Sequence, residues 1–290
     1  MSVKHPIISV TGSSGAGTTT VKHTFEQIFR REGVDAVYIE GDAFHRYDRV
    51  TMKQVMADEE ARGNKHKSHF GPDTNLLEEL ENTFRSYGET GQGQTRYYVH
   101  DGEDDKYGYP SGTFTPWEPL PETSDLLFYE GLHGAAVTDK VNIARYADLK
   151  IGVVPVINLE WIQKLHRDRK ARGYSAEAVT NTILRRMPDY VTYICPQFTE
   201  TDINFQRVPT VDTSNPFIAR WIPTPDESLV VIRFRNPRGI DFSYLVKMIH
   251  DSFMSRANSI VIPGGKLDLA MQLILTPMIA RLIELKRRAS

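Results

Sequence analysis

Cysteine is nearly absent from the sequence: Cys195 is the single cysteine among 290 residues. One thiol excludes an intrachain disulfide and any dithiol switch within one chain, and such scarcity is typical of proteins that work in a reducing compartment. We therefore interpret Cys195 as a small core residue and expect a cytoplasmic protein.

Long apolar runs are absent as well. The most apolar stretch near the C-terminus, residues 267–285, is interrupted by Asp268, Pro277, Arg281 and Glu284. These interruptions predict an amphipathic packing helix rather than a membrane span. The first residues lack the long apolar core of a secretory signal. We expect neither export nor a membrane partner.

The chain has no excess of charge of one sign, with 35 basic residues, 37 acidic residues and a formal net charge of −2. Nucleic-acid binding requires a basic surface, and two short clusters, residues 166–172 and 232–238, do not supply one. The composition is instead typical of a globular enzyme. We expect no nucleic-acid partner.

Internal repeats are also missing, and helical patterns alternate with strand patterns instead. The predicted strands are residues 6–10, 34–42, 125–134 and 148–157, and the predicted helices are residues 18–31, 75–86, 159–172 and 176–187. Near-continuous apolar strands are typical of parallel sheets that are covered on both faces. We predict one α/β domain over residues 1–290, with strand-like segments at 203–213 and 228–236 that extend the sheet antiparallel.

Residues 88–124 break this pattern, because they are rich in Gly, Pro, Tyr and charge. The segment is too long for a simple connection, so it is either disordered or a functional lid or substrate loop. Its aromatic residues favour an ordered substrate loop.

The first glycine-rich segment lacks the lysine of a phosphate-binding loop. Gly12 and Gly17 keep the usual spacing, but Thr18 stands where lysine is expected. Backbone N–H groups and the following helix N-terminus can still hold phosphate, and Thr19 can offer its hydroxyl to Mg²⁺. The alternative is a plain turn between strand and helix. The candidate ATP-binding residues of the loop are Gly12, Ser13, Ser14, Gly15, Ala16, Gly17, Thr18, Thr19 and Thr20.

The missing cation has a candidate source in the predicted helix 159–172. Lys164, Arg167 and Asp168 are spaced i, i+3 and i+4 and share one helical face, while apolar residues cover the core on another. Lys22 lies closer in sequence to the loop, but we expect it to face solvent. The alternative for the helix is a solvated face with cations near its C-terminal end.

Two carboxylates end predicted strands, where ligands bind in open α/β sheets. Asp42 is followed by His45, Arg46 and Arg49, which could bind a sugar phosphate while Asp42 takes the proton of an acceptor hydroxyl. The alternative for Asp42 is helix capping. Glu130 ends a clean apolar run and is a candidate Mg²⁺ residue rather than a surface glutamate.

Six blocks of the sequence closely resemble the bacterial phosphoribulokinase family, and the similarity runs from about residue 6 to the last helix. The blocks are SVTGSSGAGTTTVKHTF, IEGDAFHR, LLFYEGLHG, VINLEWIQKLHRDRKARGY, DTSNPFIARWIPT and VVIRFRNPRGIDF. The resemblance implies a P-loop, nucleotide monophosphate kinase-like fold. It also implies ATP-dependent phosphorylation of D-ribulose 5-phosphate at its 1-hydroxyl, which gives ribulose 1,5-bisphosphate and ADP.

The resemblance implies roles at matching positions. Asp42 would be the catalytic base, and Lys164 would contact the ATP phosphates. Asp168 would be a second essential acid near the metal, beside Glu130. Arg167 and Arg172 would belong to a mobile lid near residues 164–175 and to substrate contacts. His45 and Arg49 would hold the sugar phosphate, and Tyr98 and His100 are further substrate-side candidates.

The resemblance also implies regulation through C-terminal elements near residues 229–290. Bacterial members are similar in being homo-oligomers, commonly octamers, that are activated by NADH and inhibited by AMP. Arginines that match Arg31, Arg233 and Arg256 are implicated in that response. Members of this branch carry threonine at the position of Thr18, and thiol control is not expected here because Ala16 replaces the loop cysteine of the plant branch.

Two other functions are open on the residues alone. A uridine kinase-like enzyme would share the loop, the strand-ending Asp and an arginine-rich lid, but its acceptor carries no phosphate and does not require His45 and Arg49. A non-catalytic nucleotide sensor would explain Thr18, but it leaves the carboxylates at 42, 130 and 168 without a purpose.

Overall fold

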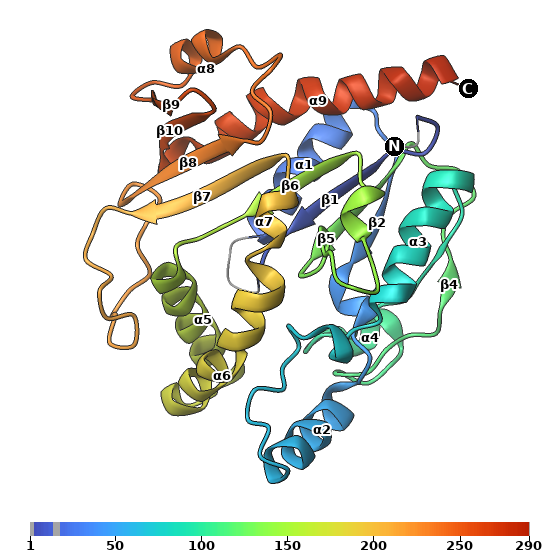
Figure 1. The fold of residues 1–290 in the computed structure, drawn as a ribbon, viewed down its shortest axis with the longest axis vertical. Coiled ribbons are helices and arrows are strands. Elements are labelled where there is room, and N and C mark those ends of the chain that lie inside the picture. The colour runs from blue at the N-terminus through green and yellow to red at the C-terminus, as the bar shows by residue number, and fades with distance from the viewer. Residues whose placement is uncertain (1–2, 14–17, 290) are drawn as a thin grey trace.

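The computed structural model describes residues 3–13 and 18–289, without the side chains of residues 18–20 and 171–172. Within these residues an eight-stranded sheet has the order β2-β5-β1-β6-β7-β8-β10-β9 (Figure 1). In this order β2, β5, β1, β6 and β7 run parallel to one another, and β8, β10 and β9 continue the sheet antiparallel. Their bounds are β1 (Ile7–Thr11), β2 (Ala36–Glu40), β5 (Leu126–Gly131), β6 (Leu149–Val153), β7 (Ile203–Pro209), β8 (Ser228–Phe234), β9 (Phe253–Arg256) and β10 (Ser259–Pro263).

Helices cover both faces of the sheet, because neighbouring residues of each parallel strand point to opposite sides. Ile8 of β1 packs with the cluster that includes helices α1 and α9, whereas Ile7 packs with α3. The longer helices are α1 (Thr18–Glu32), α2 (Arg49–Ala61), α3 (Leu77–Thr90), α5 (Ile157–Arg172), α6 (Ala176–Asp189) and α9 (Leu267–Ala289). The predicted P-loop-type α/β fold with added antiparallel strands is confirmed.

The predicted elements match the structure closely, and the differences have physical causes. Strand β7 pairs parallel with β6 through Ile151 and Ile203, so the antiparallel extension begins one strand later than expected. Cys195 is exposed rather than part of the core. It follows a π-helical turn, Tyr190–Ile194, whose buried residues are Tyr190 and Ile194. Its interpretation as a core residue was wrong.

The segment predicted to be an ordered loop is ordered. Strands β3 (Gln94–Thr95) and β4 (Glu118–Pro119) pair antiparallel. Backbone hydrogen bonds continue the pairing between them, including Thr115 N to Tyr97 O at 2.9 Å and Val99 N to Thr113 O at 2.9 Å. We call residues 94–119 the ribbon. It also carries the short helix α4 (Asp104–Tyr107).

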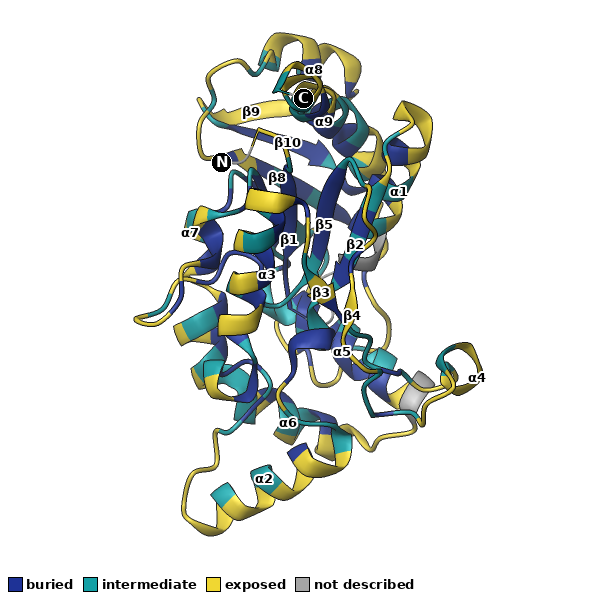
Figure 2. Cartoon of the chain, turned by 90° about the vertical axis from the view of Figure 1, so that its right-hand side faces the viewer, coloured by how far each residue is buried: buried dark blue, intermediate teal, exposed yellow. Residues whose placement is uncertain are grey.

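Helix α2 was not predicted, because its residues show little apolar periodicity. Met52 is its buried residue, and Figure 2 shows the helix largely exposed and projecting from the rest of the fold. Asp48 caps it by accepting a hydrogen bond from Thr51 N. The helix-capping alternative for Asp42 is therefore wrong. Among the described residues, no helix is long and apolar enough to cross a membrane.

Phe25 on α1 ties the phosphate-loop helix to the sheet, since its fully buried ring lies 4.8 Å from that of Phe128 and 5.7 Å from that of Phe29. We predict that Phe25→Ala lowers the free energy of unfolding by about 3–5 kcal/mol through lost burial and a residual cavity. Urea denaturation followed by circular dichroism measures it. His23→Ala, on the exposed side of the same helix, should change it by less than about 0.5 kcal/mol. Similar effects of the two variants would contradict the assigned packing.

Candidate functional site

Two glycines bring the carboxyl ends of β2 and β5 together. A Cβ at Gly131 would lie 2.6 Å from the Gly41 Cα, and a Cβ at Gly41 would lie 2.8 Å from the Gly131 Cα. Such distances are too short for any side chain, so the two backbones touch. Glu130 therefore sits beside the short 3₁₀ turn, Gly41–Phe44, that carries Asp42.

Two histidines face the carboxylate of Asp42. His45 Nε2 lies 3.6 Å from one oxygen, and His100 Nε2 lies 3.7 Å from the other. Burial lowers the pKa of His45, with Asp42 opposing and neighbouring cations adding to the effect. His45 is therefore neutral near pH 7 and can donate a hydrogen bond to a ligand.

Arg49 begins α2 beside this turn, and the ribbon holds its side chain. Its Nη1 lies 2.5 Å from Asp101 Oδ1, and its Nε donates to Tyr98 Oη at 3.4 Å. The Tyr98 ring also lies 6.0 Å from that of His45 and 5.1 Å from that of His100. The structure thus brings together the residues expected on the substrate side.

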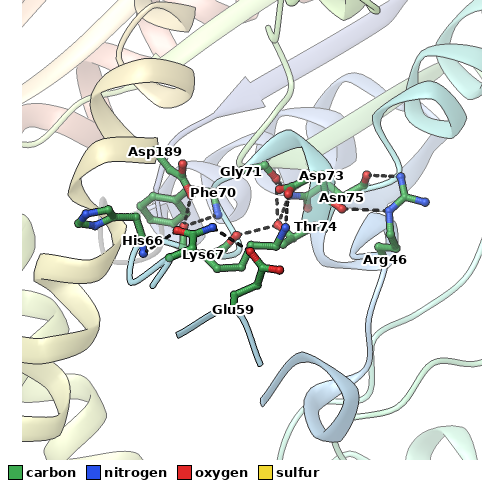
Figure 3. Close-up of polar contacts among 12 residues, drawn as sticks. Arg46, Glu59, His66, Lys67, Phe70, Gly71, Asp73, Thr74, Asn75 and Asp189 are labelled. Carbon is green, nitrogen blue, oxygen red and sulfur yellow. Dashed lines mark hydrogen bonds and ion pairs between the residues drawn. The ribbon is translucent and has the colours of Figure 1, made fainter. Parts of the chain in front are cut away.

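A compact turn at residues 66–75 supports the far side of His45. The ring of His69 lies 4.7 Å from that of His45. Asn75 Nδ2 donates to His69 O at 2.8 Å, and Ser68 Oγ bonds Asp189 of α6 at 2.7 Å (Figure 3). The pKa of His69 is well below its ordinary value because the ring is buried, and the neighbouring His45, Arg186 and Lys164 add to the effect. The turn thereby joins the Asp42 side of the site to α6.

Helix α5 presents the expected charged face, and that face is buried rather than solvated. Lys164 Nζ donates to Asp168 Oδ2 at 2.6 Å, and Arg167 Nε donates to Asp168 Oδ1 at 3.0 Å. Lys164 is 6% exposed and Asp168 is 3% exposed. Burial, with Arg186 adding, lowers the pKa of Lys164 to about 8 against the influence of Asp168.

The charge of Asp168 is stabilised by these two cations. Burial alone would raise its pKa, but Lys164 and Arg167 outweigh burial and bring the pKa below its ordinary value. The apolar face of α5 behaves as predicted, since Leu159, Ile162 and Leu165 are buried. The alternative of a solvated helix is therefore wrong for the face that carries Lys164.

The two groups of residues line one cavity of about 380 Å³. Helices α2 and α6 approach each other at its rim, where Arg185 Nη2 lies 2.8 Å from Glu60 Oε2. Among the described residues, more basic than acidic side chains line the cavity, so it favours an anionic ligand. The basic ones are Arg49, Lys53, Lys164, Arg167, Arg185 and Arg186, and the acidic ones are Asp42, Asp101 and Asp168.

The phosphate loop is described in part. Gly12 N donates to Gly131 O at 3.2 Å, so the start of the loop is fixed to the end of β5. Ser13 is 2% exposed, and the backbone of α1 begins at Thr18. Ser14, Gly15, Ala16 and Gly17 lie outside the described residues, as do the side chains of Thr18, Thr19, Thr20 and Arg172.

Lys22 is not the solvent-facing residue that the sequence predicted. Its Nζ lies 2.8 Å from Glu40 Oε1 at the end of β2, and its pKa is raised because Glu40 and the more distant Glu130 outweigh burial. A lysine neutralised by Glu40 is a poor replacement for the missing loop cation. Lys164 faces the cavity and is the better candidate.

The donor set near the strand ends fits Mg²⁺. Mg²⁺ is commonly held by one or two carboxylates together with waters and substrate phosphates, and it needs no dedicated protein cage. The described residues contain no cluster of three or more His, Cys, Asp or Glu side chains that could hold a metal. Glu130 lies half-buried at the end of β5 beside the start of the loop. Glu130, Asp168 and the hydroxyl expected from Thr19 are candidates of the correct chemistry.

The three arginines expected to respond to effectors lie away from this cavity. Arg233 of β8 and Arg256 of β9 are both exposed and flank Ser259 of β10 in register. Arg31, at the end of α1, donates to Gln272 Oε1 at 3.1 Å and to Thr276 Oγ1 at 2.7 Å, both on α9.

Several residues that line the cavity were not predicted from the sequence. Arg186 follows Val179 and Thr182 at i+7 and i+4 on α6, and all three line the cavity. This spacing on a predicted helix was a usable signal. His69 and Lys53 gave no such signal, because they come from a segment with no predicted element. Arg96, which does not line the cavity, was not predicted either, since its contacts are formed by tertiary packing.

Comparison with known proteins identifies the family of the chain. The Phosphoribulokinase / Uridine kinase family model matches residues 7–214. The chain is 79% identical over 287 residues to the phosphoribulokinase of Nitrobacter vulgaris, covering 99% of each chain. It is 68% identical over 291 residues to the chromosomal phosphoribulokinase of Cupriavidus necator, covering 100% of each.

A solved structure agrees with the sequence comparison. The structure of phosphoribulokinase from Rhodobacter spheroides matches with a TM-score of 0.91 at 67% sequence identity, covering 99% of this chain and 100% of that one. The match includes the parallel strands, the added antiparallel strands and the helices that surround the cavity. The chain is therefore a kinase that belongs to the Phosphoribulokinase / Uridine kinase family.

Proposed function

We propose that this chain is a phosphoribulokinase, which transfers the γ-phosphoryl group of ATP to the 1-hydroxyl of D-ribulose 5-phosphate. The observation that carries the proposal is that Asp42, Lys164 and Arg167 line one cavity, whose charged side chains are mostly basic among the described residues. The high identity to curated phosphoribulokinases supports the same substrate.

The residues around Asp42 bind the acceptor substrate and act on its hydroxyl. Its carboxylate takes the proton of the acceptor hydroxyl as the phosphoryl group is transferred. Arg49 and neutral His45 hold the sugar phosphate, with Tyr98 and His100 beside them. A phosphorylated acceptor gives Arg49 an anionic ligand in addition to Asp101, whereas uridine carries no anionic group for it to bind.

Helix α5 and the phosphate loop bind ATP, the phosphoryl donor. Lys164 and Arg167 contact the ATP phosphates, and Arg172 belongs to the lid and to the substrate contacts. Thr19, Glu130 and Asp168 would hold Mg²⁺, which neutralises phosphate charge and orients the transferred group. Positioning and charge stabilisation supply most of the catalysis of phosphoryl transfer.

We extend the proposal to regulation and assembly. NADH activates and AMP inhibits the enzyme through Arg31, Arg233 and Arg256, and the chain forms a homo-oligomer, commonly an octamer. The exposure of Arg233 and Arg256 on the two strands that flank β10 supports a role in binding anionic effectors. Residues 164–175 act as a lid, residues 88–124 as a substrate loop, and residues 229–290 as regulatory elements of a single cytoplasmic domain.

The substrate is tested with the purified chain, ATP and Mg²⁺ in an assay that couples ADP release to an optical signal. We expect turnover with ribulose 5-phosphate that rises when NADH is added, and no comparable turnover with uridine. Turnover with uridine together with no turnover of the sugar phosphate would overturn the assignment. A rate with ribulose 5-phosphate that ignores NADH would refute the regulatory part alone.

Asp42→Ala removes the proposed base, so we predict that kcat falls by roughly 10³- to 10⁴-fold. ATP affinity, measured by isothermal titration calorimetry, should change little, because a missing base affects the chemical step. Asp58→Ala, on the exposed side of α2, is the matched control and should keep normal kcat. Unchanged turnover in Asp42→Ala would remove this residue from the mechanism.

Lys164→Ala should lower kcat/KM for ATP by about 10²-fold, whereas Lys22→Ala should lower it by less than about fivefold. The reason is that Lys164 supplies the missing loop charge and Lys22 is already paired with Glu40. Steady-state kinetics measure both, and circular dichroism checks that each variant is folded. Equal losses would show that the compensation is wrong.

The same residue predicts a pH dependence. Lys164 has a pKa of about 8, so it is charged below pH 8 and loses its proton above it. The rate should therefore decline as the pH rises through about 8. Lys164→Arg, which stays charged, should remove that decline even if its rate is lower.

A further inference from the structure

Arg96 makes two hydrogen bonds to the turn that carries Asp42. Its Nε donates to Ala43 O at 2.8 Å, and its Nη2 donates to His45 O at 2.7 Å. Ala43 and His45 both follow Asp42 within three residues. The planar fork of one guanidinium therefore fixes the backbone on the C-terminal side of Asp42 in both position and orientation.

Two aromatic rings of the ribbon hold the same guanidinium. Its Cζ lies 3.7 Å from the ring centroid of Phe114 and 4.7 Å from that of Trp117, both within the range of a cation–π interaction. The Trp117 ring in turn lies 5.5 Å from the ring of Phe44, which belongs to the turn itself. Arg96 thus joins the ribbon to the turn through its charge, its hydrogen bonds and its packing.

The chemistry of this arrangement is unusual for a residue that only stabilises the fold. Arg96 is half-buried, and among the described residues no carboxylate forms an ion pair with it. Burial lowers its pKa, but an arginine remains charged at neutral pH. The charge is balanced by carbonyl oxygens and ring faces, and it lies close enough to His45 to lower the pKa of that histidine in addition to burial.

Arg49 forms a second connection between the ribbon and the segment that follows Asp42. Arg49 N donates to Gly112 O at 2.8 Å, and the Arg49 side chain bonds Asp101 and Tyr98 of the ribbon. The ribbon therefore holds the segment 43–49 at both ends. Loss of Arg96 would release the end that carries Asp42 while Arg49 still anchors the other.

We propose that Arg96 is a positioning residue, whose guanidinium holds the 3₁₀ turn so that Asp42 and His45 stay in reacting geometry against the acceptor. The proposal rests on the proposed function, in which Asp42 takes the acceptor proton. Arg96 does not itself line the cavity and has no bond to Asp42, and it acts through the backbone carbonyls of Ala43 and His45. It was not among the residues that sequence reasoning or the family resemblance singled out.

The test compares Arg96→Ala and Arg96→Lys with the wild type. A displacement of reacting groups by about 1 Å can cost about 10²-fold in rate. We therefore expect kcat to fall by about 10- to 100-fold in Arg96→Ala, with KM for ATP within about twofold of the wild type. Arg96→Lys keeps the charge but cannot bind both carbonyls with planar geometry, so its kcat should fall by an intermediate factor. Arg85→Ala changes an exposed arginine on α3 that donates to Asn82 Oδ1 at 2.8 Å. It is the matched control and should keep normal kcat.

A pH profile separates positioning from simple loss of stability. Without the charge of Arg96, the pKa of His45 rises, so the acidic limb of kcat/KM for ribulose 5-phosphate should move to higher pH in Arg96→Ala. Arg96→Lys should leave the limb in place. A role in stability alone would lower the amount of folded enzyme without moving the limb. A kcat within twofold of the wild type in Arg96→Ala overturns the proposal, whereas an unmoved limb would show that the charge of Arg96 does not influence His45.

Hydrogen exchange gives a readout that does not depend on the substrate. In Arg96→Ala the amides of residues 41–48 should exchange about tenfold faster than in the wild type, while those of α1 should not change. If wild-type enzyme fails to phosphorylate ribulose 5-phosphate but this exchange increases, the proposed function is wrong and the hold on the turn stands. If wild-type enzyme is active and exchange is unchanged in both Arg96 variants, the positioning proposal is wrong.

Discussion

The backbone contact between Gly41 and Gly131 is the constraint on which the site depends. Neither glycine has a positive φ, so the requirement is for space and not for an unusual backbone conformation. A side chain at either position would collide with the other strand and push the end of β2 away from the end of β5. The turn with Asp42 would then move away from Glu130 and the phosphate loop, which is fixed to Gly131 O.

The buried pair of Lys164 and Asp168 holds a positive and a negative charge at the wall of the cavity. Such a pair is costly to break, because removing one partner leaves a buried charge uncompensated. Arg167 also binds Asp168, so the carboxylate is shared between two cations. The cation consequently belongs to a helix that is packed against α6, and its placement depends on how those two helices sit against the sheet.

Sequence patterns predicted the parallel core and much of the site because both follow local rules. Apolar runs identified β1, β2, β5 and β6, and the strand-end rule located Asp42 and Glu130. Helical spacing joined Lys164, Arg167 and Asp168. Alternation alone does not give strand direction, so β7 was assigned the wrong pairing. Helix α2 was missed because it buries little, and the contacts of Arg96 and His69 exist in tertiary structure alone.

Helix α2 lies at the rim of the cavity and is held by few contacts, so access to the cavity and stability of the fold depend on different parts of the molecule. The helix buries Met52 and meets α6 through the ion pair of Glu60 with Arg185, whereas the residues of the central strand β1 are all buried. An exposed ion pair contributes little free energy. The cost of moving the rim is therefore a small part of the cost of unfolding, and the cavity can exchange its contents while the sheet stays intact.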